Sequence, residues 1–433
     1  MNSRTLEKME PAAIKPRKRQ WRTYSRDQLK AACRLVEMTG DTEIPPLIDK
    51  DSRVVVGEEF VLAARELGLK SITVVRSDRL TPDEFRLYAA NAQKMLDMGE
   101  FDEAMLSEEL KELEKLLGSD ALSDLAFEEA ELTRLLGLDS PVVEKEVQSG
   151  NPDAPIICSP GDLWIAGKHR YLCASALESA SYSVLMDGQL ATFGFTDMPF
   201  NLAMRDISSD PSREEFAFAH GEMSPNEFVR FQTTFMRLMK EHSKPGSLHA
   251  FFMSYHFLAE LLRAGIVVFG RPKAMCTWVK SQPGQGSLFR SQTEQIAYFK
   301  NGDAPHRNNV QLGKHGRNRS TAWHYDGMTT ASTERDELLQ IHATPKPVKL
   351  LKDAILDVTT RDDIVLDPFA GIGSLAIAAE SAQRRAYTIE IEPRFVDAGL
   401  RRMRDTFGIE AYRQSDGASF SELEAQALEE CAS

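Results

Sequence analysis

One run near the C-terminus limits the fold more than any other part of the chain: IVLDPFAGIGS, at residues 364–374. An apolar stretch ends at Asp367, two closely spaced glycines follow, and an alanine-rich helix is predicted directly after them. Glycines let the backbone approach a ligand at a point where a Cβ atom would clash. This order of strand, glycine loop and helix is typical of a loop that binds a nucleotide-type cofactor in an α/β fold.

A second strand is predicted at residues 385–390, within the short spacing of a βαβ unit. Its last residue, Glu390, lies about where an acid meets ribose hydroxyls in dinucleotide sites. The alternative is that the two glycines only make a tight turn between a strand and a helix. Asp367 before the loop and Glu390 after it favour the cofactor site.

The same segment resembles the S-adenosylmethionine loop of DNA amino-methyltransferases, whose usual form is Asp-Pro-Phe-x-Gly-Ser-Gly-Ser/Thr. The resemblance continues through IEIEPRFV at residues 389–396, and Ile372 between the glycines is the one departure within the loop. It implies that S-adenosyl-L-methionine is the cofactor. The residues of this segment that would contact it are Asp367, Phe369, Gly371, Gly373, Ser374 and Glu390.

A buried strand predicted at residues 190–196 runs into Asp197-Met198-Pro199-Phe200. This tetrapeptide resembles the catalytic Asp-Pro-Pro-Tyr of methyltransferases that act on exocyclic amines, which implies that its four residues are catalytic. The Asp197 carboxylate and the Met198 carbonyl would accept the two N–H bonds of the target amine, whose lone pair is delocalised into the ring. Phe200 would stack on the base, which must leave the duplex to reach the pocket.

Met198 stands where the family has proline. The carbonyl remains, but the fixed φ is lost, a preorganisation effect of about 0.4–1 kcal/mol. An effect of that size predicts a slowed enzyme more than an inactive one. Taken alone, the tetrapeptide could also be an Asp-x-Pro turn that ends a strand.

Two more segments resemble cofactor motifs of the family. Ser175, in Cys173-Ala174-Ser175-Ala176, stands where the family has an aspartate that accepts a hydrogen bond from the cofactor's adenine amine. A neutral acceptor there forfeits about 1–2 kcal/mol, or about tenfold in cofactor affinity. The run HATPKP at residues 342–347 is similar to His-Pro-Thr-Gln-Lys-Pro, which implies that Thr344 and Lys346 meet the methionine carboxylate of the cofactor.

A recognition region is expected at about residues 271–330. Residues 278–295 are similar to the hairpin that borders the base pocket in the family, and the loop at 301–325 interleaves basic residues with glycine and aromatic residues. That composition suits phosphate contacts and base readout, although a plain surface loop is the alternative. The predicted DNA-binding residues are Lys280, Arg290, Arg307, Lys314, Arg317 and Arg319.

The net charge of −13 does not exclude a DNA partner, because the charge is unevenly distributed. Residues 97–146 hold sixteen acidic residues and four Lys or Arg, whereas residues 271–319 hold nine Lys or Arg and two acidic residues. The five cysteines form no Cys-x-x-Cys pair and the nine histidines show no metal-ligand spacing, so no metal site is expected. With no signal peptide and no long apolar span, the sequence favours the cytoplasm and no membrane partner.

The N-terminal part alternates short strands and helices. Ser25 is expected to cap a helix at residues 26–37, strands are expected at 45–49, 54–57 and 71–75, and a second helix is expected at 58–67. With the pattern Gly-x-x-x-x-x-Ala-Ala-x-x-Leu-Gly at residues 57–68, this order resembles the ParB/Srx-like domain.

In that family a His-Gly-Arg or Glu-Arg-Arg follows the glycine, whereas this chain has Glu58-Glu59-Phe60. Two carboxylates without an arginine repel a triphosphate. The resemblance therefore implies a degenerate domain that serves DNA docking or assembly rather than nuclease or CTP chemistry.

We expect an α/β fold: a Rossmann-like S-adenosylmethionine-dependent methyltransferase domain preceded by a small ParB/Srx-like α/β domain. Further strands are expected at residues 169–173, 248–254, 266–269 and 296–299. The expected segments are a basic tail at 1–23, the ParB/Srx-like domain at 24–95, an acidic helical connector at 96–139, a linker at 140–160, the methyltransferase domain at 161–415 and a C-terminal tail at 416–433.

Together the resemblances imply a site-specific methyltransferase that acts on double-stranded DNA. Adenine N6 is the expected target because an aspartate, not a serine, opens the tetrapeptide at Asp197. Cytosine N4 is one alternative. The other is a catalytically impaired relative that binds DNA without methylating it, which the substitutions at Ser175 and Met198 motivate. The sequence is compatible with a homodimer but does not fix the oligomeric state.

Overall fold

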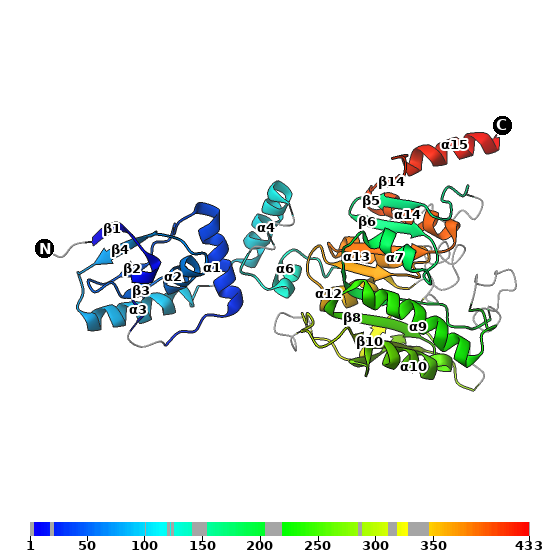
Figure 1. Cartoon of the computed structure of the whole chain (residues 1–433), viewed down its shortest axis with the longest axis horizontal. Coiled ribbons are helices and arrows are strands. Elements are labelled where there is room, and N and C mark those ends of the chain that lie inside the picture. Colours follow the sequence, from blue (N-terminus) through cyan, green and yellow to red (C-terminus); the bar gives the residue numbers. More distant parts are fainter. Residues whose placement is uncertain are drawn as a thin grey trace. The chain divides into compact units, whose positions relative to one another are not determined.

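The computed structural model describes residues 4–17, 21–99, 101–118, 122, 125–140, 154–203, 219–284, 288–310, 318–327 and 346–432. The chain divides into two compact units, residues 1–128 and residues 129–433 (Figure 1). This division differs from the expected segments, because the acidic connector at 96–139 is split between the two units.

The first unit is built on a four-stranded sheet in the order β1-β4-β2-β3. Its strands are β1 (Arg4–Met9), β2 (Leu47–Ile48), β3 (Val54–Val56) and β4 (Ile72–Ser77). β1 runs antiparallel to β4, and Ile14, which follows it, is 1% exposed in the core. The N-terminal segment is therefore not a tail before residue 24. A charged edge strand is hard to tell from a disordered tail in sequence, because natural edge strands carry charges that block further pairing.

The helices of the first unit follow the sequence closely. α1 (Arg26–Thr39) begins with a capping box, in which the Ser25 hydroxyl accepts from the Gln28 amide and the Gln28 side chain accepts from the Ser25 amide. α2 (Glu58–Glu66) follows Gly57, so the predicted helices at 26–37 and 58–67 are confirmed. α3 (Pro82–Leu96) and α4 (Glu103–Leu117) complete the unit.

The second unit contains a ten-stranded sheet in the order β11-β9-β10-β8-β7-β12-β13-β6-β5-β14. The five adjacent strands from β8 to β6 in this order are parallel to one another. The strands are β5 (Leu163–Ala166), β6 (His169–Cys173), β7 (Ala191–Thr196), β8 (Ser243–Met253), β9 (Ala274–Lys280), β10 (Thr293–Lys300), β11 (Ala322–Tyr325), β12 (Ile364–Asp367), β13 (Arg385–Glu390) and β14 (Ala411–Arg413). The expected α/β fold with a parallel-rich sheet is confirmed.

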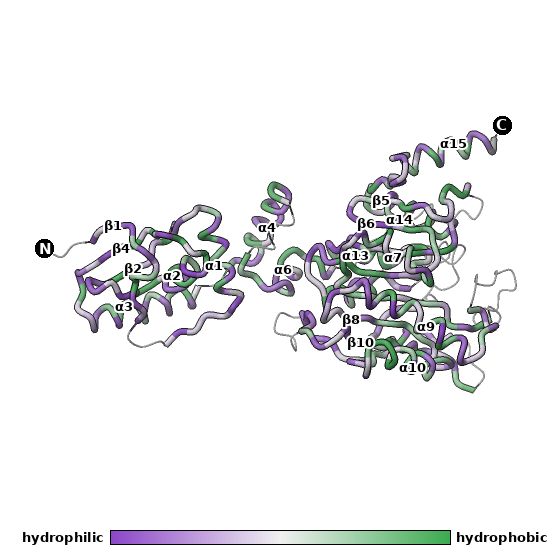
Figure 2. Tube along the Cα trace, in the orientation of Figure 1, coloured by the Kyte–Doolittle hydropathy of each residue, from purple (hydrophilic) through white to green (hydrophobic). Residues whose placement is uncertain are grey.

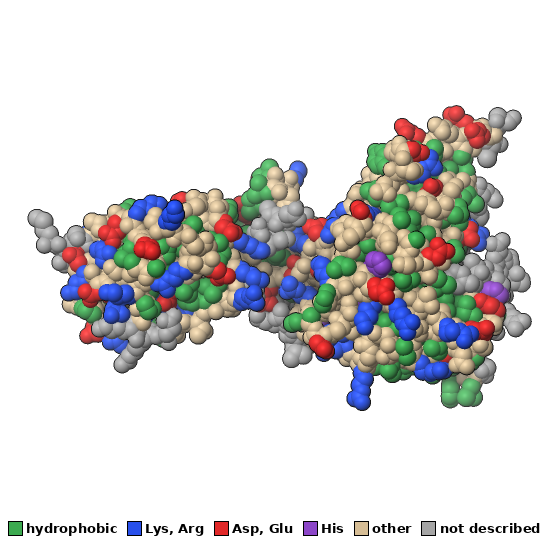
Figure 3. All heavy atoms as spheres, in the orientation of Figure 1, with side chains coloured by type: hydrophobic (Ala, Val, Ile, Leu, Met, Phe, Trp, Pro, Cys, Tyr) green, Lys and Arg blue, Asp and Glu red, His purple; other side chains and the backbone are tan. Residues whose placement is uncertain are grey.

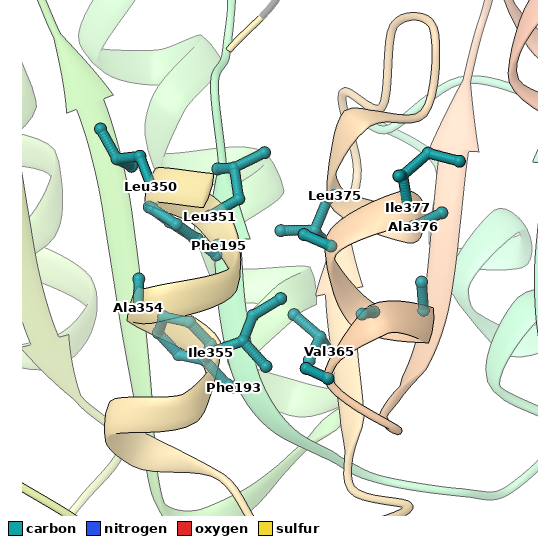
Figure 4. Close-up of a cluster of buried hydrophobic side chains, with 14 of the residues drawn as sticks. Phe193, Phe195, Leu350, Leu351, Ala354, Ile355, Val365, Leu375, Ala376 and Ile377 are labelled. Carbon is teal, nitrogen blue, oxygen red and sulfur yellow. The ribbon is translucent and has the colours of Figure 1, made fainter. Parts of the chain in front are cut away.

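Helices cover both faces of this sheet. Along β12, Val365 packs into one hydrophobic cluster, whereas Ile364 and Leu366 pack into another on the opposite face. The first cluster includes side chains of α12 (Val348–Val358), α13 (Ser374–Ser381) and α14 (Pro393–Phe407), and the second includes side chains of α7 (Ser179–Met186), α9 (Pro225–Glu241) and α10 (Leu258–Phe269). Figure 4 shows Phe193 and Phe195 of β7 beside the apolar side chains of α12. The unit is thus a three-layer α/β/α domain, followed by α15 (Phe420–Ala432).

One strand prediction is wrong. Residues 266–269 form the last turn of α10 and not a strand. Much of α10 is coloured as hydrophobic in Figure 2, and a run of four apolar residues fits a helix as well as a strand. The apolar positions further back along α10, Leu261, Ala264 and Gly265, are buried at helical spacing.

The order in which the chain adds strands to the sheet reverses between β7 and β12. These strands are parallel neighbours, but the chain continues from β7 to β8 on one side and from β12 to β13 on the other. In open α/β sheets, ligands bind outside the carboxyl ends of the strands at such a point. Both Asp197 and the glycine loop follow these two strands.

Candidate active site

Two aspartates lie at the carboxyl ends of β7 and β12. The Thr196 hydroxyl donates to Oδ1 of Asp367 at 2.6 Å, and the Phe369 amide donates to the same oxygen at 3.1 Å. Burial raises the pKa of Asp367 to about 7 against these two hydrogen bonds, and the charges of Asp197 and Glu390 raise it further. The hydrogen bond from the Thr196 hydroxyl joins the end of β7 to the end of β12.

Glu390 clamps the glycine loop from the end of β13. Its Oε2 accepts from the Gly371 amide at 2.8 Å and its Oε1 accepts from the Glu392 amide at 2.9 Å. Each carboxylate oxygen has a second lone pair, so Glu390 can hold the loop and still accept a bond from a ligand hydroxyl. Ser175 lies at the same edge of the sheet, because it follows Cys173 of β6, which pairs with Glu390. The Ser175 hydroxyl accepts a hydrogen bond from the Leu177 amide.

Both loop glycines adopt positive φ, 52° at Gly371 and 75° at Gly373. A Cβ atom at Gly373 would lie 3.2 Å from the Cα atom of Gly399 on α14. Gly373 is therefore required for the backbone conformation and for the close approach of two helices. Ile372 between them is 2% exposed, so the family's serine is replaced here by a core side chain.

Arg402 on α14 forms hydrogen bonds with the glycine loop and is not among the site residues that the sequence predicts. Its fully buried guanidinium donates from Nη1 to the Ile372 carbonyl at 2.6 Å and to the Ser374 hydroxyl at 3.1 Å. Ser374, predicted as a cofactor contact, is thus already engaged from the protein side. The available signal was a charged residue between Leu400 and Met403 on the apolar face of an amphipathic helix.

We expect Arg402→Met to destabilise the domain by about 1–3 kcal/mol, because it leaves a buried carbonyl of the loop without its donor. Urea unfolding of the purified protein measures the change. Arg394→Met, on the same helix but at a side chain that is 45% exposed, is the matched control and should change the unfolding free energy little. Equal stabilities of the two variants would contradict the supporting role of Arg402.

Asp197 lies in a network of charged side chains that are fully or partly buried. Lys346 Nζ is 2.6 Å from Asp197 Oδ2 and 3.3 Å from Glu294 Oε2, and Lys280 Nζ is 2.6 Å from Glu294 Oε1. Asp197 Oδ1 is buried and has no hydrogen-bond partner among the described residues. Burial raises the pKa of Asp197 to about 6, while Lys346 acts to lower it and Glu294 to raise it.

Two members of this network differ from what the sequence indicated. Lys346, assigned to the cofactor carboxylate, has its ammonium between the carboxylates of Asp197 and Glu294. Glu294 was not predicted as a site residue, although it lies in the hairpin run that resembles the family's pocket border. Thr344 lies outside the described residues.

The other residues of the tetrapeptide differ in burial: Met198 is buried, whereas Pro199 and Phe200 are partly exposed. Met198 is 1% exposed and belongs to the cluster that includes α9, so its side chain is a core element. Phe200 is partly buried against both clusters, and its ring lies 5.4 Å from the Lys346 ammonium. Phe369 of the loop packs edge-on against Phe235 with ring centroids 4.9 Å apart. Pro199, which lies between Met198 and Phe200 in sequence, is half-buried.

The predicted DNA-binding residues fall into three groups. Arg307 is exposed, and Arg290 donates to the Pro283 and Gly284 carbonyls within its own hairpin. Lys280 is held by Glu294 in the charge network. Arg319 packs over Trp323 at 4.4 Å and pairs with Asp357 at 2.6 Å. Lys314 and Arg317 lie outside the described residues.

Among the described residues on the face drawn in Figure 3, Lys and Arg are interspersed with Asp and Glu. Internal partners already engage the charges of Arg319 and Lys280. Arg290 and Arg307 are therefore the described candidates with the freest access to a phosphate. Within the described residues, no helix has the length and apolarity needed to cross a membrane.

Known proteins resemble the part of the chain that contains this site. A family model described as DNA methylase (N6_N4_Mtase) matches residues 192–401. The Type II methyltransferase M2.DpnII of Streptococcus pneumoniae is 29% identical over 228 residues, which cover 48% of this chain and 81% of that protein. M.Cfr9I of Citrobacter freundii, also a Type II methyltransferase, is 28% identical over 138 residues, and the match spans only 43% of its length.

Among solved structures, the cytosine-N4-specific PvuII DNA methyltransferase is 14% identical and aligns with a TM-score of 0.44 over 61% of this chain and 94% of its own. The family match begins at β7 and ends in α14, so it includes Asp197, the glycine loop and Glu390. Residues 192–401 thus resemble the DNA methylases that this family model describes.

Proposed function

We propose that this chain transfers a methyl group from S-adenosyl-L-methionine to the exocyclic amine of a base in double-stranded DNA, with adenine N6 as the target. The observation that carries the proposal is Oδ1 of Asp197, which is buried and has no hydrogen-bond partner among the residues that the structure describes. A buried acceptor without a partner costs free energy unless a ligand satisfies it. A base amine is such a ligand.

The residues of the loop fit this cofactor. Asp367 and Glu390 place carboxylates on both sides of the glycines, and carboxylates accept the hydrogen bonds that ribose hydroxyls donate. Burial raises the pKa of both groups, and a sulfonium cation nearby would favour their ionised forms. When bound, the cofactor supplies an electrophilic methyl group. Ser175 at the neighbouring strand end would accept from its adenine amine.

Asp197 performs two tasks in this arrangement. Its free oxygen would hold one N–H of the target amine, and the Met198 carbonyl would hold the other, which orients the nitrogen lone pair. The same carboxylate is the nearest acceptor for the proton that the amine loses on methylation. Phe200, with its ring partly exposed, would stack on the extruded base.

The test is tritiated methyl transfer from the cofactor to duplex DNA, followed by digestion and separation of the labelled nucleosides. Label in N6-methyladenine supports the proposal in full. Label in N4-methylcytosine would move the target to cytosine, which the acidic first residue of the tetrapeptide disfavours. No label in DNA, with cofactor binding detected by calorimetry, would favour the alternative of an impaired relative that binds DNA only.

The replacement of the family's aspartate by Ser175 makes a gain of affinity testable. Ser175→Asp is expected to strengthen cofactor binding by about tenfold, because a charged acceptor would meet the adenine amine. Isothermal titration with S-adenosylhomocysteine measures it. Ser179→Asp, which adds the same charge at an exposed position a few residues away, should leave the affinity unchanged. Equal gains in both variants would refute the contact.

The first unit is proposed as a degenerate ParB/Srx-like domain for DNA docking or assembly. The acid at its helix start, Glu58, is 4% exposed and lies 4.0 Å from the Arg17 guanidinium. Arg17 thus neutralises part of the charge that would repel a nucleotide, although it precedes the motif in sequence. We propose double-stranded DNA as the partner, a homodimer as the assembly and the cytoplasm as the location.

A further inference from the structure

We propose that Lys346 is a positioning residue for Asp197: its ammonium holds Oδ2, fixes the carboxylate as an anion and leaves Oδ1 turned to the target amine. Glu294 and Lys280 keep that ammonium in place. This inference rests on the proposed methyl transfer and reassigns Lys346 from the cofactor to the base side of the pocket.

Geometry restricts the Lys346 ammonium from several sides. Its side chain is 8% exposed, and Nζ lies 2.6 Å from Asp197 and 3.3 Å from Glu294. The rings of Phe200 and Phe252 are 5.4 and 5.2 Å away, within the range of cation–π attraction. A lysine normally carries considerable rotamer freedom, so an ammonium bounded by two carboxylates and two rings is an ordered donor.

The division of the Asp197 oxygens follows from this contact. Oδ2 faces Lys346, and Oδ1 is buried without a partner among the described residues. A carboxylate held at one oxygen cannot rotate freely, so the other oxygen keeps its direction before the base arrives. Preorganised acceptors of this kind contribute to rate because they need no rearrangement during the reaction.

Charge balance gives Lys346 a second effect. The charged groups around Asp197 are Lys346, Glu294 on β10, Lys280 on β9 and Asp367 on β12. Burial already raises the pKa of Asp197 to about 6. Without Lys346, Asp197 would face two acids with one more distant cation, and like charges disfavour ionisation. Its pKa would rise further, and a protonated carboxyl is a poorer acceptor for an amine at neutral pH.

The experiment is the pH dependence of kcat/KM for methyl transfer by wild type and Lys346→Met. Because the lost cation lowered the pKa of Asp197, the acid limb of the variant should move to higher pH by at least about 1 unit, with activity partly restored at alkaline pH. The control is Lys349→Met, which removes a half-exposed lysine that pairs with Asp353 on the same helix. Its profile should match that of wild type.

An unmoved acid limb in Lys346→Met would overturn the inference. Binding of S-adenosylhomocysteine and of 5′-methylthioadenosine, which lacks the methionine carboxylate, provides a second readout. If Lys346 contacts the cofactor instead, the variant binds the first about tenfold more weakly and the second as wild type does, which also overturns it. Unchanged affinity for both supports it.

The proposed function can fail separately. If wild type transfers no methyl group to DNA, the proton uptake of Asp197 is still measurable as the difference between titrations of wild type and Asp197→Asn. When the same pair of titrations is performed in the Lys346→Met background, the midpoint of this proton uptake must shift to higher pH. The same midpoint in both backgrounds would overturn the inference without reference to catalysis.

Discussion

Asp197→Asn is expected to lower kcat for methyl transfer by at least about 10²-fold, comparable to removing one preorganised partner from other active sites. The substitution keeps the size of the side chain but replaces an anionic acceptor by an amide. The amide can no longer hold the amine with a full charge or take up its proton. Lys346 retains Glu294 as a partner, so the pocket need not collapse.

Cofactor affinity separates this effect from a general loss of structure. S-adenosylhomocysteine binding by Asp197→Asn should remain within about twofold of wild type, since Asp367 and Glu390 are untouched. Asp187→Asn is a suitable control, because Asp187 is mostly exposed and its φ of 48° is one that asparagine tolerates. Methyl transfer by Asp197→Asn at the rate of Asp187→Asn would exclude a catalytic role for this carboxylate.

Gly373→Ala is expected to destabilise the domain by about 2–5 kcal/mol and to abolish measurable cofactor binding. Alanine at a φ of 75° costs about 1–2 kcal/mol. The new Cβ atom would also lie 3.2 Å from the Cα atom of Gly399, so α13 and α14 must separate, at about 1–3 kcal/mol. The glycine loop joins β12 to α13, and any separation therefore moves the loop.

Gly408→Ala isolates the two contributions. Gly408 has nearly the same φ, 71°, but a Cβ atom there would meet nothing within 4 Å. It should show the conformational cost alone and bind the cofactor as wild type does. Urea unfolding and calorimetry with S-adenosylhomocysteine provide both measurements. Similar losses in the two variants would show that helix contact at Gly373 contributes nothing.

The elements around the loop were predictable because their signals are local. The apolar strand, the two glycines and the alanine-rich helix lie within twenty residues. The observed bounds of β12, α13 and β13 agree with these signals. The charge network was not predictable. Asp197, Glu294 and Lys346 come from three distant segments, and no periodicity in the sequence shows that their side chains meet.

Other differences have equally specific causes. Arg402 appears in sequence as one of several arginines on α14, and its place between Leu400 and Met403 indicates burial but not the loop carbonyl that it binds. The residues of β1 predict a tail because most of them are polar. An edge strand can have the same composition when one of its sides faces solvent. In each case the deciding information lies in a contact between elements and not in the element itself.

The hydrogen bond between Thr196 and Asp367 joins positions 171 residues apart in sequence. All of the expected recognition region lies within that span, whereas the strands that carry the two positions are direct neighbours. Most of the recognition region that we propose can therefore change without separating these two strands. Lys280 and Glu294 are the exception, because their charges hold Lys346 beside Asp197, and a segment exchanged to give a new target site must retain both.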